Sequence, residues 1–199
     1  MTSSIYCVID RSGSMDACRK DTIGGFNVFL TEQDPETTIN INLFDHEYTE
    51  LYSGSVKDAK KLSMETFVPR GNTALFDAIG KTIKKVDGTE GPPIIVILTD
   101  GEENSSREFT QNHIKDLIEE KTKQGWSFVF LGANQDAIMA AKNFGMSPLS
   151  AMTFSPDNVG VALRSVSSAI KRGLTNKSAG TPVAVEFSQA EREESIASN

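Results

Sequence analysis

The sequence predicts an α/β fold with a mainly parallel central sheet and helices on both faces. Two continuous apolar runs, residues 94–98 and 127–131, are typical of strands that are covered on both sides. Between such runs, apolar side chains recur at helical spacing, as in residues 75–86, and gather on one face. Strands that alternate with helices favour parallel pairing, because a helix can carry the chain back to the start of the next strand.

Other segments complete this prediction. Residues 5–9 form a further apolar run near the start of the chain. Residues 39–44 and 48–53 alternate between apolar and polar side chains and are separated by a short turn, which predicts a hairpin. A hairpin pairs antiparallel, so we expect one antiparallel strand at an edge of the sheet. Apolar residues also return to one face around residues 114–118 and 159–170, which predicts two more helices.

Composition restricts the class of protein. A length of 199 residues suits a single domain with a sizeable core. The net charge of −7 disfavours binding to nucleic acid or to an anionic membrane. No apolar run approaches the roughly 18 residues of a membrane span, and residues 1–4 are too few for a signal peptide. We therefore expect a cytoplasmic protein, in the host cytoplasm if it is viral, with proteins or cations as partners.

The pentad Asp10-Arg11-Ser12-Gly13-Ser14 follows the first apolar run directly. It places one carboxylate and two hydroxyls, at a spacing of two, where a parallel strand turns into a helix. Oxygen ligands of this kind suit a hard divalent cation such as Mg²⁺. The pentad therefore predicts a metal site, although the two serines could also cap a helix without any metal.

Asp100 and Thr73 are the other candidate ligands. Asp100 follows the strand 94–98, and in parallel sheets ligands bind at the carboxyl ends of strands, where the strand order reverses. If the first strand is central and these two strands are neighbours, Asp10 and Asp100 meet at one crevice. Thr73 follows a glycine loop and precedes a helix, where it could simply be the N-cap. Aspartate is also a common turn residue at strand ends, so each signal alone has a plain alternative.

Together, these residues resemble the metal-ion-dependent adhesion site of the von Willebrand factor A family. The pattern is Asp10-x-Ser12-x-Ser14, then Thr73 after a glycine loop, then Asp100-Gly101. The resemblance covers about residues 4–174 and extends to the phrases Leu43-Phe44-Asp45, Gly71-x-Thr73-Ala74-Leu75-x-Asp77-Ala78-Ile79 and Leu98-Thr99-Asp100-Gly101-Glu102-Glu103. Residues 130–134 look like the corresponding segment of small stand-alone bacterial and phage members. The resemblance implies a Rossmann-like fold.

The resemblance also assigns roles to the candidate ligands. Ser12 and Ser14 would contact the metal directly, and Thr73 directly or through water. Asp10 would act mostly through water and hydrogen bonds, and Asp100 directly or through water. The expected ion is Mg²⁺, with Mn²⁺ or Ca²⁺ as alternatives.

Neutral hydroxyl ligands leave a divalent ion with much of its positive charge. An open coordination position can then accept an Asp or Glu carboxylate from another protein, an attraction larger than that of an exposed salt bridge. We therefore expect a metal-dependent protein-binding module, an adaptor and not an enzyme. Asn72, Glu102 and Glu103 are the expected partner-binding rim.

Two other functions stay open at this stage. The first is a Mg²⁺-dependent phosphoryl-transfer or phosphatase-like enzyme with Asp10 as nucleophile. That reaction usually places a second Asp two residues further on, where this chain has Ser12. The second is a structural or assembly subunit of a larger complex, for which no repeat or coiled coil provides support.

Three features outside the expected site also give predictions. Asp45 is interpreted as a hairpin residue and not as a ligand. Gly24 and Gly25 lie inside a helical pattern at a cost of about 1 kcal/mol each relative to Ala, so we expect close packing of helix on sheet to require them.

The third feature is a change of pattern at residue 175. We expect a domain over residues 1–174 and a partly mobile C-terminal extension over residues 175–199. The short alternation at residues 183–187 either adds an edge strand or binds a partner, and a tail carboxylate such as Glu193 is a hypothetical self-inhibitor of the metal site.

Overall fold

The computed structural model describes residues 4–133, 136–177 and 182–197. Within these residues, six strands form one sheet in the order β3-β2-β1-β4-β5-β6. Only β3 runs antiparallel to its neighbour, and the other pairs are parallel. This arrangement confirms the predicted fold class and the predicted hairpin at an edge of the sheet. The strands are β1 Ile5–Asp10, β2 Thr38–Phe44, β3 Tyr48–Ser55, β4 Ile94–Thr99, β5 Ser127–Ala133 and β6 Ala151–Phe154.

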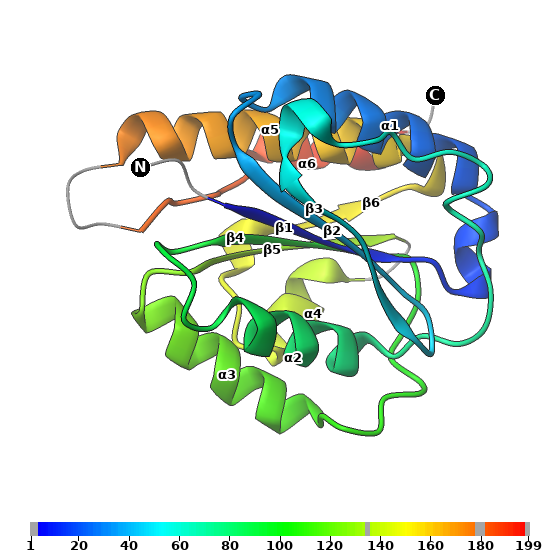
Figure 1. Cartoon of the computed structure of the whole chain (residues 1–199), viewed down its shortest axis with the longest axis horizontal. Coiled ribbons are helices and arrows are strands. Elements are labelled where there is room, and N and C mark those ends of the chain that lie inside the picture. The colour runs from blue at the N-terminus through cyan, green and yellow to red at the C-terminus, as the bar shows by residue number, and fades with distance from the viewer. Residues whose placement is uncertain (1–3, 134–135, 178–181, 198–199) are drawn as a thin grey trace.

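Helices cover both faces of the sheet (Figure 1). α1, α5 and α6 lie on one face, and α2, α3 and α4 lie on the other. An apolar core fills each of the two layers between helices and sheet. The helices are α1 Arg19–Glu32, α2 Leu75–Val86, α3 Gln111–Lys123, α4 Ala137–Asn143, α5 Val159–Asn176 and α6 Gln189–Ile196, with short 3₁₀ turns at Gly13–Asp16, Val56–Asp58, Pro148–Ser150 and Pro156–Asn158.

β1 is the central strand that positions the candidate site. It pairs with β2 on one side, where Asp10 lies opposite Phe44, and with β4 on the other, where Ile9 lies opposite Leu98. Every residue of β1 and β4 is buried, as the continuous apolar runs predict for strands covered on both faces. The chain leaves β1 toward β2 and later returns to β4 on the opposite side. The strand order therefore reverses at the carboxyl ends of β1 and β4, where ligands of such sheets bind.

The two glycines of α1 have different roles. A Cβ added to Gly25 would lie 2.6 Å from Cα of Gly160, so α1 and α5 approach each other too closely for a larger residue. A Cβ on Gly24 would meet nothing within 4 Å. The expected close packing is therefore between two helices and not between helix and sheet, and it requires only Gly25.

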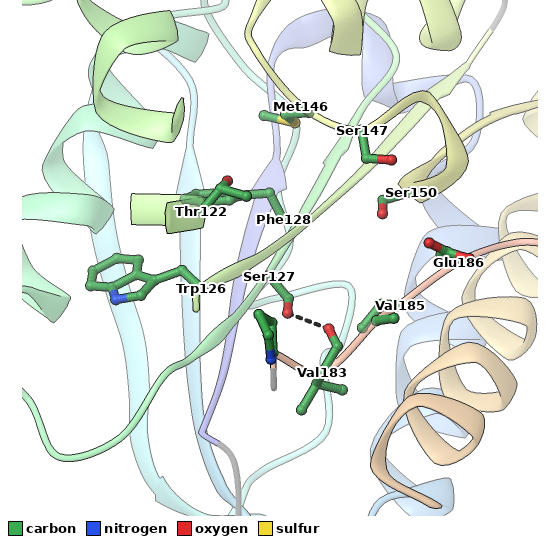
Figure 2. Close-up of a pocket in the computed structure, with 12 residues that line it drawn as sticks. Thr122, Trp126, Ser127, Phe128, Met146, Ser147, Ser150, Val183, Val185 and Glu186 are labelled. Carbon is green, nitrogen blue, oxygen red and sulfur yellow. Dashed lines mark hydrogen bonds between the residues drawn. The ribbon is translucent and has the colours of Figure 1, made fainter. Parts of the chain in front are cut away.

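The described part of the expected C-terminal extension packs against the edge of the sheet. α5 continues past residue 174 to Asn176, and from residue 183 onward alternate side chains are buried, namely those of Val183, Val185 and Phe187. The hydroxyl of Ser127 donates to the carbonyl oxygen of Val183 at 2.5 Å, and both residues line a small cavity beside β5 (Figure 2). Residues 182–187 form no strand of the sheet. Residues 178–181 and 198–199 lie outside the described residues, so the mobility of the extension stays a prediction.

α6 protects the outer edge strand β6. The guanidinium of Arg192 donates to the carbonyl oxygens of Leu149, at 2.8 Å, and of Ala151. The hydroxyl of Ser195 donates to the carbonyl oxygen of Thr153 at 2.7 Å. Two of these carbonyl oxygens, those of Ala151 and Thr153, belong to β6, and an unprotected edge strand would offer such groups to another chain.

Across the residues that the structure describes, none of the helices combines the length and the apolar character that crossing a membrane requires.

Substituting the two glycines of α1 separately tests the helix contact. Gly25→Ala should destabilise the protein by about 1–3 kcal/mol, because the added methyl group forces α1 away from α5. Gly24→Ala should stabilise it by about 1 kcal/mol, because alanine favours the helix and meets no neighbour. Urea unfolding of both variants measures the two free energies, and equal effects would contradict this account of the packing.

Candidate metal centre

Asp10 ends β1 with a completely buried side chain. The backbone N–H of Ser12 donates to its Oδ1 at 2.6 Å, and the hydroxyl of Thr99 donates to its Oδ2 at 2.6 Å. Burial raises the pKa of Asp10 to about 6, although the hydrogen bonds from Thr99 and Ser12 lower the pKa and the charge of Asp100 raises it. The structure therefore holds a carboxylate whose charge is only partly compensated.

Ser12 and Ser14 lie on the turn that follows β1. Their Oγ atoms are 3.1 Å apart, and the Ser14 hydroxyl donates to Oδ1 of Asp100 at 2.6 Å. Ser12 is buried and Ser14 is exposed, so this pair extends from the sheet to the surface. Ser12 is the N-cap of the 3₁₀ turn, but its side chain forms no capping hydrogen bond. The two hydroxyls therefore face each other, and that of Ser14 also faces Asp100, instead of capping a helix.

Thr73 approaches the same place from another loop. It is buried, and the N-cap of α2 is Ala74, so Thr73 does not have the capping role that its sequence position suggested. The glycine after Asp100 shows how closely the segments converge. A Cβ on Gly101 would lie 2.9 Å from Thr73 Oγ1, 3.4 Å from Ser14 Oγ and 3.7 Å from Asp10 Oδ2. Oxygens from two separate segments, the end of β1 with its following turn and the loop before α2, thus surround one point beside the loop after β4.

Within the part of the chain that the structure describes, no cationic side chain balances the charge of this cluster. Among the described residues, no salt bridge involves Asp10 or Asp100. Burial raises the pKa of Asp100 as well as that of Asp10. Two acidic groups beside three hydroxyls form an all-oxygen donor set of the kind that Mg²⁺ prefers. The residues present therefore fit a divalent cation, which Ser12, Ser14, Thr73, Asp10 and Asp100 would hold.

The expected rim residues differ in their environments. Asn72 and Glu102 are exposed. Glu103 is half-buried, and its Oε2 accepts the backbone N–H of Phe76 at 2.9 Å, in the first turn of α2. Its Oε1 accepts the backbone N–H of Ser106 at 2.7 Å. The Glu103 carboxylate is thus engaged within the chain, where it joins the loop after β4 to the start of α2.

Asp77 is a residue whose role the sequence analysis did not identify. Its Oδ2 accepts the backbone N–H of Arg107 at 2.9 Å, and its Oδ1 accepts those of Glu108 and Phe109, each at 2.9 Å. Asp77 therefore fixes the far end of the loop that begins with Asp100. The available signal was a charged residue on the otherwise apolar face of α2.

A second group of potential metal ligands lies at the β2–β3 turn. Asp45, His46 and Glu47 each offer an atom within 4.8 Å of the others. Asp45 is completely buried, and its Oδ2 accepts hydrogen bonds from Nε of Arg11 and Nε of Arg70. Its Oδ1 accepts the backbone N–H of Glu47 at 2.7 Å. Both oxygens are thus engaged and the charge is neutralised, so this group suits a structural role better than a metal, in agreement with the interpretation of Asp45 as a hairpin residue.

The candidate site lies at the carboxyl ends of β1 and β4, where the strand order of the sheet reverses. α/β domains with mainly parallel sheets bind their ligands at this place, and the chain is therefore a member of this class. Within this class, the chain belongs to the von Willebrand factor type A domain family, whose model matches residues 4–169. A search of curated protein sequences finds no match to this chain.

Solved structures of low sequence identity share the fold. The ArnB paralog VWA2 from Sulfolobus acidocaldarius is 21% identical, with a TM-score of 0.62, over 83% of this chain and 45% of that one. A von Willebrand factor type A protein from Catenulispora acidiphila is 15% identical, with a TM-score of 0.66, and the match covers 84% of this chain and 42% of that one. The vWF domain of the type V pili tip protein Mfa5 from Porphyromonas gingivalis is 11% identical, with a TM-score of 0.67, and the match covers 89% of this chain and 97% of that one. The chain thus spans less than half of the first two proteins.

Gly101→Ala tests the convergence of oxygens directly. The added methyl group would occupy the point that Thr73, Ser14 and Asp10 surround, so Mg²⁺ binding should weaken by about tenfold or more. Gly24→Ala is the matched control, because its methyl group would lie on α1 outside the site and would meet nothing within 4 Å. Titration calorimetry measures the Mg²⁺ affinity of both variants. Undiminished binding by the Gly101 variant would show that an ion does not occupy this point.

Proposed function

We propose that this chain is a metal-dependent protein-binding module that captures an acidic side chain of a partner protein. The proposed ion is Mg²⁺, held by Asp10, Ser12, Ser14, Thr73 and Asp100, with Mn²⁺ or Ca²⁺ as alternatives. The observation that carries the proposal is the convergence of these oxygens around Gly101, beside two carboxyl groups that no cationic side chain of the described residues pairs with.

The environments of these residues suit such a role. Asp10 is completely buried and accepts hydrogen bonds on both oxygens, so it provides fixed negative charge beneath the site. Ser14 is exposed and Asp100 is half-exposed, so the outer side of the site is open to another molecule. A divalent cation bound there supplies positive charge that neutral hydroxyl ligands compensate only in part, and this charge attracts a carboxylate.

Family membership supports the same class of function. Domains of the von Willebrand factor type A family are commonly metal-dependent protein-interaction modules. One structural neighbour is part of a pilus tip protein, although a likeness at 11% identity carries only the fold to this chain. The partner and its acidic residue therefore belong to the proposal.

The geometry gives less support to a phosphoryl-transfer enzyme. A nucleophilic Asp10 would need an oxygen that substrate can reach, yet its side chain is completely buried and both oxygens accept hydrogen bonds. The second position of the pentad carries Ser12, which cannot replace a carboxylate as acid and base. Binding without catalysis is therefore the function that we propose.

Affinity capture from an extract of the native host tests the proposal. The protein should retain a partner in buffer with millimolar Mg²⁺ and lose it when EDTA is added. Ser14→Ala should lose the partner in Mg²⁺ because it removes an exposed ligand. Ser53→Ala, an exposed serine on β3 outside the site, should retain the partner.

The identified partner then allows a stricter test. Replacing its metal-binding Asp or Glu by Asn or Gln should abolish capture, because an amide carries no negative charge for the ion. A partner that is retained equally in EDTA and by the Ser14 variant would contradict the proposed function.

A further inference from the structure

Asp45 lies at the turn between β2 and β3, beside the proposed ligands but not among them. Its side chain is completely buried, whereas the two guanidinium groups that pair with it are more accessible, with exposed fractions of 12% for Arg11 and 47% for Arg70. Both Nε atoms donate to the same oxygen, Oδ2, at 3.0 Å from Arg11 and 2.8 Å from Arg70. One carboxylate thus joins two arginines that belong to different loops.

Arg11 connects Asp45 to the first ligand loop. It lies between Asp10 and Ser12, and its backbone N–H donates to the carbonyl oxygen of Phe44 at 2.7 Å. Its Nη2 atom also donates to the hydroxyl of Thr49 on β3 at 3.0 Å. The backbone between Asp10 and Ser12 is therefore held against the hairpin by both main-chain and side-chain bonds.

Arg70 connects Asp45 to the second ligand loop, which contains Thr73. The backbone N–H of Arg70 donates to the carbonyl oxygen of Arg11 at 2.8 Å, and the backbone N–H of Ala74 donates to the carbonyl oxygen of Asp45 at 2.8 Å. The loop is thus attached to the hairpin region on both sides of Thr73. A further backbone bond, from Gly13 to Gly71 at 3.2 Å, joins the two ligand loops directly.

The pairing has an electrostatic consequence. With the Asp45 carboxylate in place, the two guanidinium groups share one buried counter-ion, and that of Arg70 also pairs with the exposed carboxylate of Glu47. Without Asp45, Arg11 would have no counter-ion among the described residues and would face Arg70 in a partly buried region, where their repulsion is less screened than in water. The loops that carry Ser12, Ser14 and Thr73 would then separate, although no ligand had changed.

We infer that Asp45 is a positioning residue for the metal site: through Arg11 and Arg70 it sets the spacing between the hydroxyls of Ser12 and Ser14 and that of Thr73. This inference rests on the proposed function, because it assumes that those hydroxyls bind an ion. It also assigns a role to the group Asp45, His46 and Glu47 that needs no second metal.

Titration calorimetry with Mg²⁺ on the full chain tests the inference. Asp45→Asn should weaken binding by about 10–100-fold, the usual effect of removing a group that orients metal ligands. Arg70→Gln removes the more exposed partner and should also weaken binding, and Arg70→Lys, which keeps the charge, should recover part of the loss. The number of ions bound per chain should stay the same in all variants.

Asp87→Asn is the matched control. It breaks an ion pair of similar length, 2.7 Å from Lys121 Nζ to Asp87 Oδ1, that lies at the other end of α2. This variant should bind Mg²⁺ like the unmodified protein. Thermal melting of each variant fixes an assay temperature at which all are folded, and if Asp45→Asn does not fold, the two Arg70 variants carry the test.

The outcomes separate this inference from the proposed function. If the unmodified chain does not bind Mg²⁺, both fail. If it binds, and Asp45→Asn and Arg70→Gln bind with the same affinity, only the positioning role is overturned. If the unmodified chain binds two ions and Asp45→Asn binds one, Asp45 is a ligand and the inference is wrong.

Discussion

The burial of Asp10, for which the described residues provide no cationic partner, is the constraint on which the rest of the site depends. Asp10 and Asp45 are both completely buried near the same edge of the sheet. The chain neutralises Asp45 with two guanidinium groups, whereas its described residues give Asp10 only hydrogen bonds and place a second carboxyl group, Asp100, nearby. Burying uncompensated charge is costly, and a divalent cation among the surrounding hydroxyls would remove that cost. Asp45, whose charge is neutralised, thus has a structural role, whereas Asp10, whose charge the described residues leave uncompensated, belongs to a site that can bind a cation.

The sequence predicts much of this arrangement because the relevant signals are local. Apolar runs of strand length identified β1, β4 and β5, and period-two alternation identified the β2–β3 hairpin. The carboxyl ends of parallel strands lie at one edge, so Asp10 and Asp100 were expected to meet if β1 and β4 were neighbours, and the structure pairs these two strands. Two alternatives that the sequence left open were capping roles for Ser12 and Thr73, and the structure shows neither side chain in that role.

Contacts between distant segments could not be predicted in the same way. Gly25 contacts Gly160, and Arg192 donates to the carbonyl oxygen of Ala151, but no local sequence pattern predicts either contact. Glu103 is one more case, because a sequence of acidic residues after a strand gives no indication of which carboxylate faces solvent and which accepts backbone hydrogen bonds. Such contacts depend on the relative positions of elements, which periodicity and composition do not encode.

A crystal of the protein soaked in Mn²⁺ gives the most direct measurement, because this ion substitutes for Mg²⁺ at oxygen sites and has a strong anomalous signal. The account predicts an anomalous peak among the hydroxyls of Ser12, Ser14 and Thr73, at ligand distances of about 2.1 Å. A peak at Asp45, His46 and Glu47 instead, or no peak at either place at millimolar Mn²⁺, would contradict it.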